Sequence, residues 1–192
     1  MRICVFGAAS PTIDPEYIQK VEQMGLELAK RGHSLVFGAG ANGLMGAAAR
    51  GFKAGQGYIL GVVPSFFRED TIEALYDQCD QMIETETMRE RKQIMEDNAD
   101  AFIVVPGGIG TFEEFFEILT SKQLCRHNKP IAIYNLKGYY NEMEQLLVTA
   151  MEKNFIRNDC HALYHLSDDL GSICAYLEGP HIQRTVRDLK DG

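Results

Sequence analysis

The sequence predicts an α/β protein with a single doubly wound, mostly parallel sheet flanked by helices, a Rossmann-like fold. Short apolar runs alternate along the chain with longer segments of helical periodicity, which is typical of repeated strand–helix units. Runs such as Ile103-Val104-Val105 and Ile131-Ala132-Ile133 are continuously apolar, as expected of parallel strands covered on both faces. Ligands of such sheets bind at the carboxyl ends of the strands, so we expect the function to lie in the loops that follow them.

Each predicted element rests on its local pattern. Strands are predicted where a short apolar run is bounded by turn residues, at 2–7, 34–37, 58–63, 81–84, 101–105, 130–134 and 162–166. Helices are predicted where apolar residues recur every three or four positions, at 15–30, 43–54, 86–98, 111–124, 139–153 and 170–177. Pro64 stops the third strand. We expect one catalytic domain over 1–180 and a polar C-terminal tail over 181–192.

Composition and charge argue against several classes of protein. No apolar run approaches the ~20 residues that span a bilayer, and the first apolar run reaches Gly7 too soon for a secretion signal. The net charge of −8 argues against a nucleic-acid surface, which needs an excess of lysine and arginine. The 5 cysteines are scattered, without a C-x-x-C pair, which indicates reduced thiols and a cytoplasmic location.

The strongest functional motif is Pro106-Gly107-Gly108-Ile109-Gly110-Thr111, between a predicted strand and a predicted helix. Glycines let the backbone approach a ligand closely. The start of a helix offers unpaired N–H groups and a partial positive charge to an anion. Thr111 adds a hydroxyl donor or caps the helix. A tight turn alone needs fewer glycines, so this loop is predicted to bind a phosphate group.

A second glycine-rich segment, Gly38-Ala39-Gly40-Ala41-Asn42-Gly43, satisfies the G-x-G-x-x-G spacing of dinucleotide-binding loops. However, it follows the second strand, and the third strand ends in Val63-Pro64-Ser65, with no acidic residue for a ribose. Three interpretations stay open: a dinucleotide loop, a wall of a mononucleotide-phosphate site that includes Gly40, or close packing of a helix on a strand. We favour the phosphate wall.

The helix predicted at 86–98 carries two cations on the face expected to be apolar. At 3.6 residues per turn, Arg91 and Lys92 share a face with Met88, Met95 and Ala99. Both cations could extend to the rim or pair with acids at an interface. In a chain that already has an anion loop, we favour a phosphate or leaving-group contact for Arg91. For Lys92 the two interpretations are evenly balanced.

Three glutamates, Glu113, Glu114 and Glu117, lie on the helix that follows the glycine loop. Acidic residues in a first turn are favoured by the helix dipole. Glu113 and Glu114 leave the apolar face in different directions, so at most one of them faces the ligand. A carboxylate one turn from a bound phosphate is poorly placed to bind it. It is well placed to stabilise a positive charge that develops on the attached ribose.

Together these segments resemble the LONELY GUY (LOG) family. Residues 106–114 are similar to its signature P-G-G-x-G-T-x-x-E, and residues 88–92 resemble its M-x-x-R-K segment. Gly43-Leu44-Met45-Gly46 and the strand that follows Lys129 are similar as well. The resemblance implies a homodimeric enzyme, without metal or cofactor, that hydrolyses adenine-type nucleoside 5′-monophosphates, including AMP and cytokinin nucleotides, to the free base and ribose 5-phosphate.

The resemblance also implies roles for individual residues. Arg91 and Glu114 would be catalytic. The 5′-phosphate would lie on Gly107, Gly108, Gly110 and Thr111. Further substrate contacts are expected from Ser10, Gly40, Glu73, Lys92 and Thr120.

The chain departs from the family at two places near the predicted pocket. The family usually has three consecutive glycines where this chain has Gly38-Ala39-Gly40, and a G-S-S turn where it has Gly7-Ala8-Ala9-Ser10. These changes bear on the shape of the pocket and hence on the preferred base. Arg89 stands where histidine is common, and the helical projection points it away from Arg91.

The sequence therefore predicts an N-glycosyl hydrolase. Glu114 would stabilise an oxocarbenium-like state and orient the attacking water, while Arg91 anchors the phosphate or assists the departing base. The alternative is a sensor or carrier of related fold that binds a nucleotide without chemistry. A pyridoxal-phosphate decarboxylase would need a buried lysine, for which Lys92 is the one candidate. A metal site at Cys160, His161 and His165 is disfavoured because their spacing does not suit one face.

Overall fold

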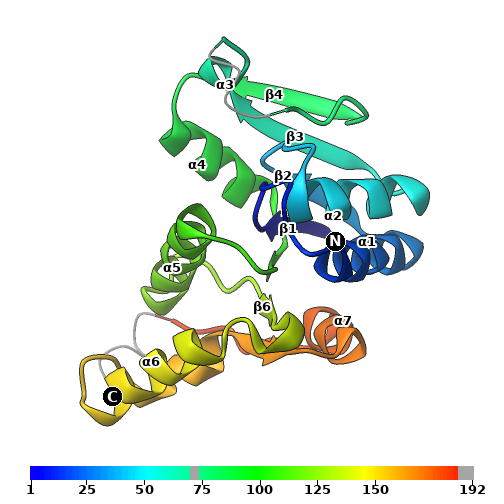
Figure 1. Ribbon diagram of the computed structural model, residues 1–192. Coiled ribbons are helices and arrows are strands. Elements are labelled where there is room, and N and C mark those ends of the chain that lie inside the picture. Colours follow the sequence, from blue (N-terminus) through cyan, green and yellow to red (C-terminus); the bar gives the residue numbers. More distant parts are fainter. Residues whose placement is uncertain (70–73, 186–192) are drawn as a thin grey trace.

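The computed structural model describes residues 1–69 and 74–185 (Figure 1). Its strands are β1 (Arg2–Phe6), β2 (Ser34–Phe37), β3 (Ile59–Pro64), β4 (Gln81–Thr85), β5 (Ala101–Val104), β6 (Ile131–Tyr134) and β7 (His165–Ser167). The α-helices are α1 (Pro15–Lys30), α2 (Gly43–Ala54), α3 (Ser65–Glu69), α4 (Met88–Asn98), α5 (Ile109–Gln123), α6 (Asn141–Glu152) and α7 (Leu170–Glu178). Two 3₁₀ helices, η1 (Leu136–Gly138) and η2 (Asn158–Leu163), complete the set.

The strands form one 7-stranded sheet in the order β4-β3-β2-β1-β5-β6-β7, and every neighbouring pair is parallel. The chain begins in the middle at β1, moves outward to β4 and returns to β5, which lies beside β1 on the other side. The connections therefore diverge between β1 and β5. This switch point is where the loops after two central strands separate and leave room for a ligand.

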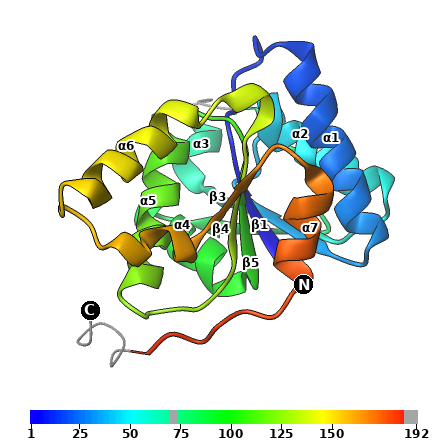
Figure 2. The same ribbon diagram turned by 90° about the horizontal axis from the view of Figure 1, so that it is seen from below.

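Helices cover both faces of the sheet, α1, α2 and α7 on one and α4, α5 and α6 on the other (Figures 1 and 2). Side chains along β1 point alternately to the two faces of the sheet, which explains why both faces are covered by helices. Ile3 and Val5 enter the core beneath α1, α2 and α7, whereas Cys4 and Phe6 enter the core beneath α4, α5 and α6. All four side chains are at most 2% exposed, so the central strand is apolar on both faces.

The start of α4 is fixed by two reciprocal hydrogen bonds. The Thr87 hydroxyl accepts a hydrogen bond from the Glu90 amide at 3.1 Å, and the Glu90 carboxylate accepts one from the Glu86 amide at 2.9 Å. Such caps satisfy N–H groups that have no partner within the helix. They also set the rotation of α4, so that Arg91 and Met95 face the sheet while Arg89 is exposed.

The structure confirms the predicted fold class. The bounds of α1, β2 and α2 are those predicted, and the other predicted elements, β7 apart, begin and end within two residues of the expected positions. β7 starts later than expected because η2 occupies 158–163. The short helices α3, η1 and η2 were not predicted, since three to six residues are too few to show helical periodicity. Among the residues the structure describes, no helix has the length and apolar character to cross a membrane.

Candidate active site

A cavity of about 370 Å³ opens at the switch point between β1 and β5. Its walls come from the loop after β1, from α2, α3 and α4, and from the start of α5. The residues that line it are Gly7, Ala8, Ala9, Ser10, Met45, Phe67, Arg91, Gly108, Gly110, Thr111 and Glu114. Segments that are distant in the sequence therefore meet at one place, at the carboxyl ends of the central strands.

The predicted anion loop forms the floor of this cavity. Gly108 is the N-cap of α5, and the first bond of the helix runs from the Phe112 amide to the Gly108 carbonyl at 3.0 Å. The amides of 109–111 precede that bond and carry the positive end of the helix dipole. A Cβ atom on Gly108 or Gly110 would meet no atom within 4 Å, so glycine at these positions keeps the floor open.

The guanidinium of Arg91 is buried at the back of the cavity, with 5% of the residue exposed. Its Nε donates a hydrogen bond to the Val62 carbonyl at 3.2 Å, and its Nη2 donates one to the Gly38 carbonyl at 3.1 Å. The ring of Phe67 lies 5.5 Å from its Cζ, as in a cation–π contact. No carboxylate among the described residues forms an ion pair with it. Among the described residues, no ion pair therefore neutralises the charge of Arg91.

Gly38 has a defined part in this arrangement. A Cβ atom at Gly38 would lie 1.6 Å from Nη2 of Arg91, so any other residue would displace the guanidinium. Three interpretations of the second glycine-rich segment were open. For Gly38 the structure agrees with close packing, and the group packed against it is the Arg91 side chain. Ala39 adopts φ +63°, a conformation that favours glycine, and glycine is the residue the LOG family usually has there.

Glu114 faces the same cavity from α5 and is partly buried. Burial raises the pKa of its carboxyl group from 4.5 to about 7, and the positive charge of Arg91 opposes that rise. Near neutral pH the group therefore exists in both protonation states. It is thus able to accept a proton from a water molecule, the property expected of a general base.

The other predicted substrate contacts divide into two groups. Ser10 and Thr111 line the cavity with Arg91. Gly107 does not line this cavity. It lines an apolar hollow of about 190 Å³ instead, and its carbonyl accepts a hydrogen bond from the Tyr139 hydroxyl at 2.7 Å. Gly40 forms a bridge with Leu75 instead of lining the cavity.

Lys92 and Thr120 also lie away from the cavity, and Glu73 lies outside the described residues. The Nζ of Lys92 contacts the carboxylates of Glu113 and Glu117 on α5, the latter at 2.6 Å. Thr120 is exposed on the same helix. Of the two interpretations considered for Lys92, the structure agrees with pairing to acidic residues. A Schiff base would require breaking both contacts.

The histidines considered as metal ligands have other partners. His161 lies 3.3 Å from a carboxylate oxygen of Glu144. His165 stacks on the ring of Tyr176 and hydrogen-bonds with the Ser172 hydroxyl at 2.8 Å. These contacts account for both side chains without a metal ion.

The residue that sequence reasoning missed is Phe67. It belongs to α3, a helix of 5 residues, which shows no periodicity. The pair of aromatic residues Phe66-Phe67, one residue after the strand-ending Pro64, was the available signal. An aromatic pair at the carboxyl end of a strand is a candidate wall of a ligand pocket.

The fold and this cavity define a doubly wound α/β protein with a pocket at its switch point that is lined by a buried arginine and a glutamate. Residues 45–177 match the family model described as "Possible lysine decarboxylase". A probable cytokinin riboside 5′-monophosphate phosphoribohydrolase of Oryza sativa is 35% identical, covering 94% of this chain and 74% of the relative. A protein named as such a phosphoribohydrolase in Mycobacterium tuberculosis is 39% identical, covering 80% of this chain and 81% of the relative. The chain belongs to the LOG family.

Solved structures share the fold at lower identity. The molybdenum cofactor carrier protein of Chlamydomonas reinhardtii superimposes with a TM-score of 0.68 at 23% identity, over 91% of this chain and 93% of that one. The protein TM1055 gives a TM-score of 0.70 at 19% identity, over 92% and 98%. At these identities the likeness concerns the fold alone.

The raised pKa of the Glu114 carboxyl group leads to a prediction for the pH dependence of folding stability. The unfolded carboxyl group ionises near pH 4.5, whereas the folded one keeps its proton until about pH 7. The folded state therefore loses stability as the pH rises from 4.5 to 7, and the loss is complete above that range. Glu114→Gln should raise the melting temperature at pH 8 by several degrees, at about 2–4 °C for each kcal/mol of destabilisation removed, and change it little at pH 4.5. Calorimetry at both pH values measures this.

Glu142→Gln, an exposed change on α6, is the matched control for that experiment. Equal melting temperatures of wild type and Glu114→Gln at pH 8 would show that burial does not destabilise the Glu114 carboxylate.

Proposed function

We propose that this protein hydrolyses the N-glycosidic bond of adenine-type nucleoside 5′-monophosphates, giving the free base and ribose 5-phosphate. AMP and cytokinin riboside monophosphates are the expected substrates, the latter because the relatives are named for them. The observation that carries the proposal is the meeting of Arg91, Glu114 and the start of α5 around one cavity. The reaction has three requirements. In the proposal the start of α5 anchors the phosphate, Arg91 provides a cationic contact, and Glu114 provides a carboxylate.

The 5′-phosphate is assigned to the amides of 109–111 and the Thr111 hydroxyl. Helix N-termini bind phosphate through free N–H groups and the helix dipole. Arg91 supplies the full positive charge that the amides lack. Its guanidinium already has two carbonyl acceptors, so a phosphate oxygen meets a fixed cation without reorganisation. Binding at this remote group positions the ribose above Glu114.

Glu114 is assigned the chemistry at the anomeric carbon. As the bond to the base breaks, positive charge grows on the ribose, and an ionised carboxylate stabilises it. The same group accepts a proton from the attacking water, whose oxygen forms the new bond to C1′. The departing base takes up a proton from solvent, and Glu114 returns the proton of the attacking water to solvent, so that one water is divided between the ribose and the base. A carboxyl group with a pKa of about 7 is matched to this proton transfer at neutral pH.

The non-catalytic alternative is a nucleotide sensor or carrier. The carrier protein among the solved structures shares the fold alone, and a shared fold does not imply a shared function. A carrier has no use for a buried carboxylate beside a phosphate site, because the two negative charges repel. Glu114 therefore favours the hydrolase.

We also take residues 1–180 as the catalytic domain, supported by the single sheet that these residues form. Residues 181–185, the first part of the polar tail, contact Asn128 and Asp159 through Arg184. A cytoplasmic location is proposed because all five cysteines are free thiols.

The substitution Glu114→Gln tests the proposal directly. The variant should still bind AMP, measured by titration calorimetry, because the phosphate contacts are intact. Its rate of adenine release, measured by chromatography, should fall by a factor of about 10²–10³, the usual cost of losing one electrostatic stabiliser.

Glu113→Gln is the matched control, since this neighbouring carboxylate pairs with Lys92 outside the cavity. It should keep a rate close to that of wild type. Adenine release by Glu114→Gln at the wild-type rate would refute the assignment of Glu114, and a wild-type protein that binds AMP but never releases adenine would support the carrier.

Gly38→Ala tests the placement of Arg91. The added methyl group displaces the guanidinium, and misplacing a catalytic group by about 1 Å costs up to ~10²-fold in rate. We expect weaker AMP binding and slower adenine release in a folded protein. Ala39→Gly is the control and should retain activity, because Ala39 already has the backbone conformation of glycine. An active Gly38→Ala protein would contradict the role given to the guanidinium.

We further propose a homodimer that pairs through α4 and α5. Support comes from large apolar side chains that remain exposed on these helices, Ile109 at 83%, Leu124 at 50% and Met88 at 39%, since exposed apolar patches mark interfaces. Light scattering should give twice the chain mass of 21.5 kDa. Leu124→Glu should shift the assembly to monomers, and a monomeric wild type would contradict the pairing.

A further inference from the structure

A second cavity, of about 480 Å³, lies at the amino end of the sheet. The end of α5, the loop before β6 and the segment after α7 enclose it. Lys122, Asn128, Tyr176, His181 and Arg184 are among its walls. Because α5 rises ~1.5 Å per residue, Lys122 lies roughly 20 Å from the start of α5 at Ile109. The two cavities are therefore separate.

Lys122 is a buried cation without an acceptor. The residue is 6% exposed, and its Nζ forms no hydrogen bond or ion pair with any residue in the described ranges. Burial and the charge of Arg184 lower the pKa of its amino group to about 8. A cation is favoured in the last turn of a helix, but the dipole supplies no hydrogen-bond acceptor. Within the described ranges, the Lys122 amino group therefore has no protein acceptor.

Arg184 brings a second cation to the same cavity. Its backbone is fixed on Asn128 by two hydrogen bonds, from the Arg184 amide at 2.8 Å and to the Arg184 carbonyl at 3.1 Å. Its Nη2 contacts Asp159. Its Nη1 is buried and has no acceptor among residues 1–69 and 74–185. Two donor groups that line one cavity, the amino group of Lys122 and Nη1 of Arg184, therefore have no acceptor among the described residues.

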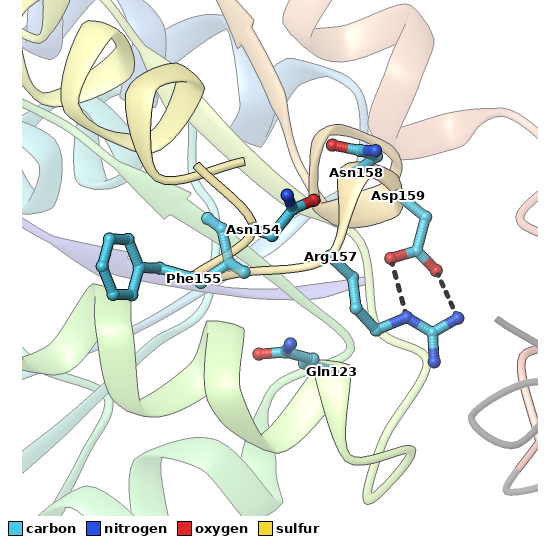
Figure 3. A pocket seen from close by; sticks show the side chains of 7 residues that line it. Gln123, Asn154, Phe155, Arg157, Asn158 and Asp159 are labelled. Carbon is cyan, nitrogen blue, oxygen red and sulfur yellow. Dashed lines mark hydrogen bonds and ion pairs between the residues drawn. The ribbon is translucent and has the colours of Figure 1, made fainter. Parts of the chain in front are cut away.

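Asp159 cannot satisfy both of them. It also pairs with Arg157, whose Nε lies 3.3 Å from its carboxylate, as Figure 3 shows. That pair lines a neighbouring hollow of about 510 Å³, formed by Gln123 and 154–159. Arg157 and Arg184 thus both contact Asp159, and no described carboxylate contacts Lys122, in a chain whose net charge is −8. Local positive charge of this kind is the requirement for an anion site.

We propose that this cavity binds a small organic anion, with its carboxylate or phosphate group between Lys122 and Arg184. The oxyanion accepts charge-assisted hydrogen bonds from the Lys122 amino group and from Nη1 of Arg184, the two donor groups that have no acceptor among the described residues. The rest of the molecule packs on the rings of Tyr176 and His181, which meet edge to face at 5.1 Å. Apolar walls with a few convergent polar groups are typical of ligand sites.

Differential acetylation of Lys122 tests the site on the full-length protein. Sulfosuccinimidyl acetate at pH 8 reacts with the unprotonated amine, and peptide mass spectrometry gives the rate at each lysine. The probes are inorganic phosphate and benzoate, at constant ionic strength. An opposite charge within ~4–6 Å raises a lysine pKa by about 1–3 units, so acetylation of Lys122 should slow about fivefold or more. The exposed Lys153 is the internal control.

The two probes separate the sources of the anion, since protection by phosphate alone indicates a phosphoryl ligand and protection by benzoate alone a carboxylate. Arg184→Gln should abolish the protection. An unchanged Lys122 rate with both probes overturns the proposal, and so does protection that persists in Arg184→Gln. Protection that appears only after Asp188→Asn and Asp191→Asn are combined also overturns it, because the chain's own carboxylates would then be the occupants.

Discussion

The architecture of the candidate active site depends on one buried cation. The Arg91 guanidinium donates hydrogen bonds to the carbonyl groups of Gly38 and Val62, at the ends of β2 and β3. No described carboxylate forms an ion pair with it. Burying a charge is costly unless it is paired. Carbonyl groups satisfy the donors but leave the net charge in place. Because these carbonyls follow or belong to inner strands of the sheet, the guanidinium is fixed, and its charge stays unpaired among the described residues.

Glu114 completes the site by staying apart from Arg91. A direct ion pair would neutralise both groups and leave the cavity with little attraction for an anion. Instead the two residues enter the same space from α4 and α5 and influence each other at a distance, as the effect of Arg91 on the pKa of Glu114 shows. One end of the cavity thus remains available to a phosphate, and the other keeps a carboxylate that binds a proton near neutral pH.

Periodicity was enough to predict the fold and the inward direction of Arg91, because both follow from spacing along one segment. Contacts between segments do not follow from spacing along one segment. That Lys92 pairs with Glu113 and Glu117 depends on how α4 lies against α5, and that Gly38 contacts Arg91 depends on the order of the strands. Sequence patterns do not record such distances. Phe67 was missed for a further reason, because α3 is too short to leave a pattern.

The choice between a hydrolase and a carrier depends on the energetic effect of Glu114, since the fold provides a pocket at the switch point in either case. In the empty cavity burial already disfavours the ionised carboxylate. A bound phosphate dianion disfavours it further, so a protein that only binds nucleotides would gain affinity by replacing this residue. The carboxylate becomes favourable when the neighbouring ribose carries positive charge. In the proposed reaction that charge exists only while the glycosidic bond is breaking, so the proposal has Glu114 stabilise the transition state more than the bound substrate.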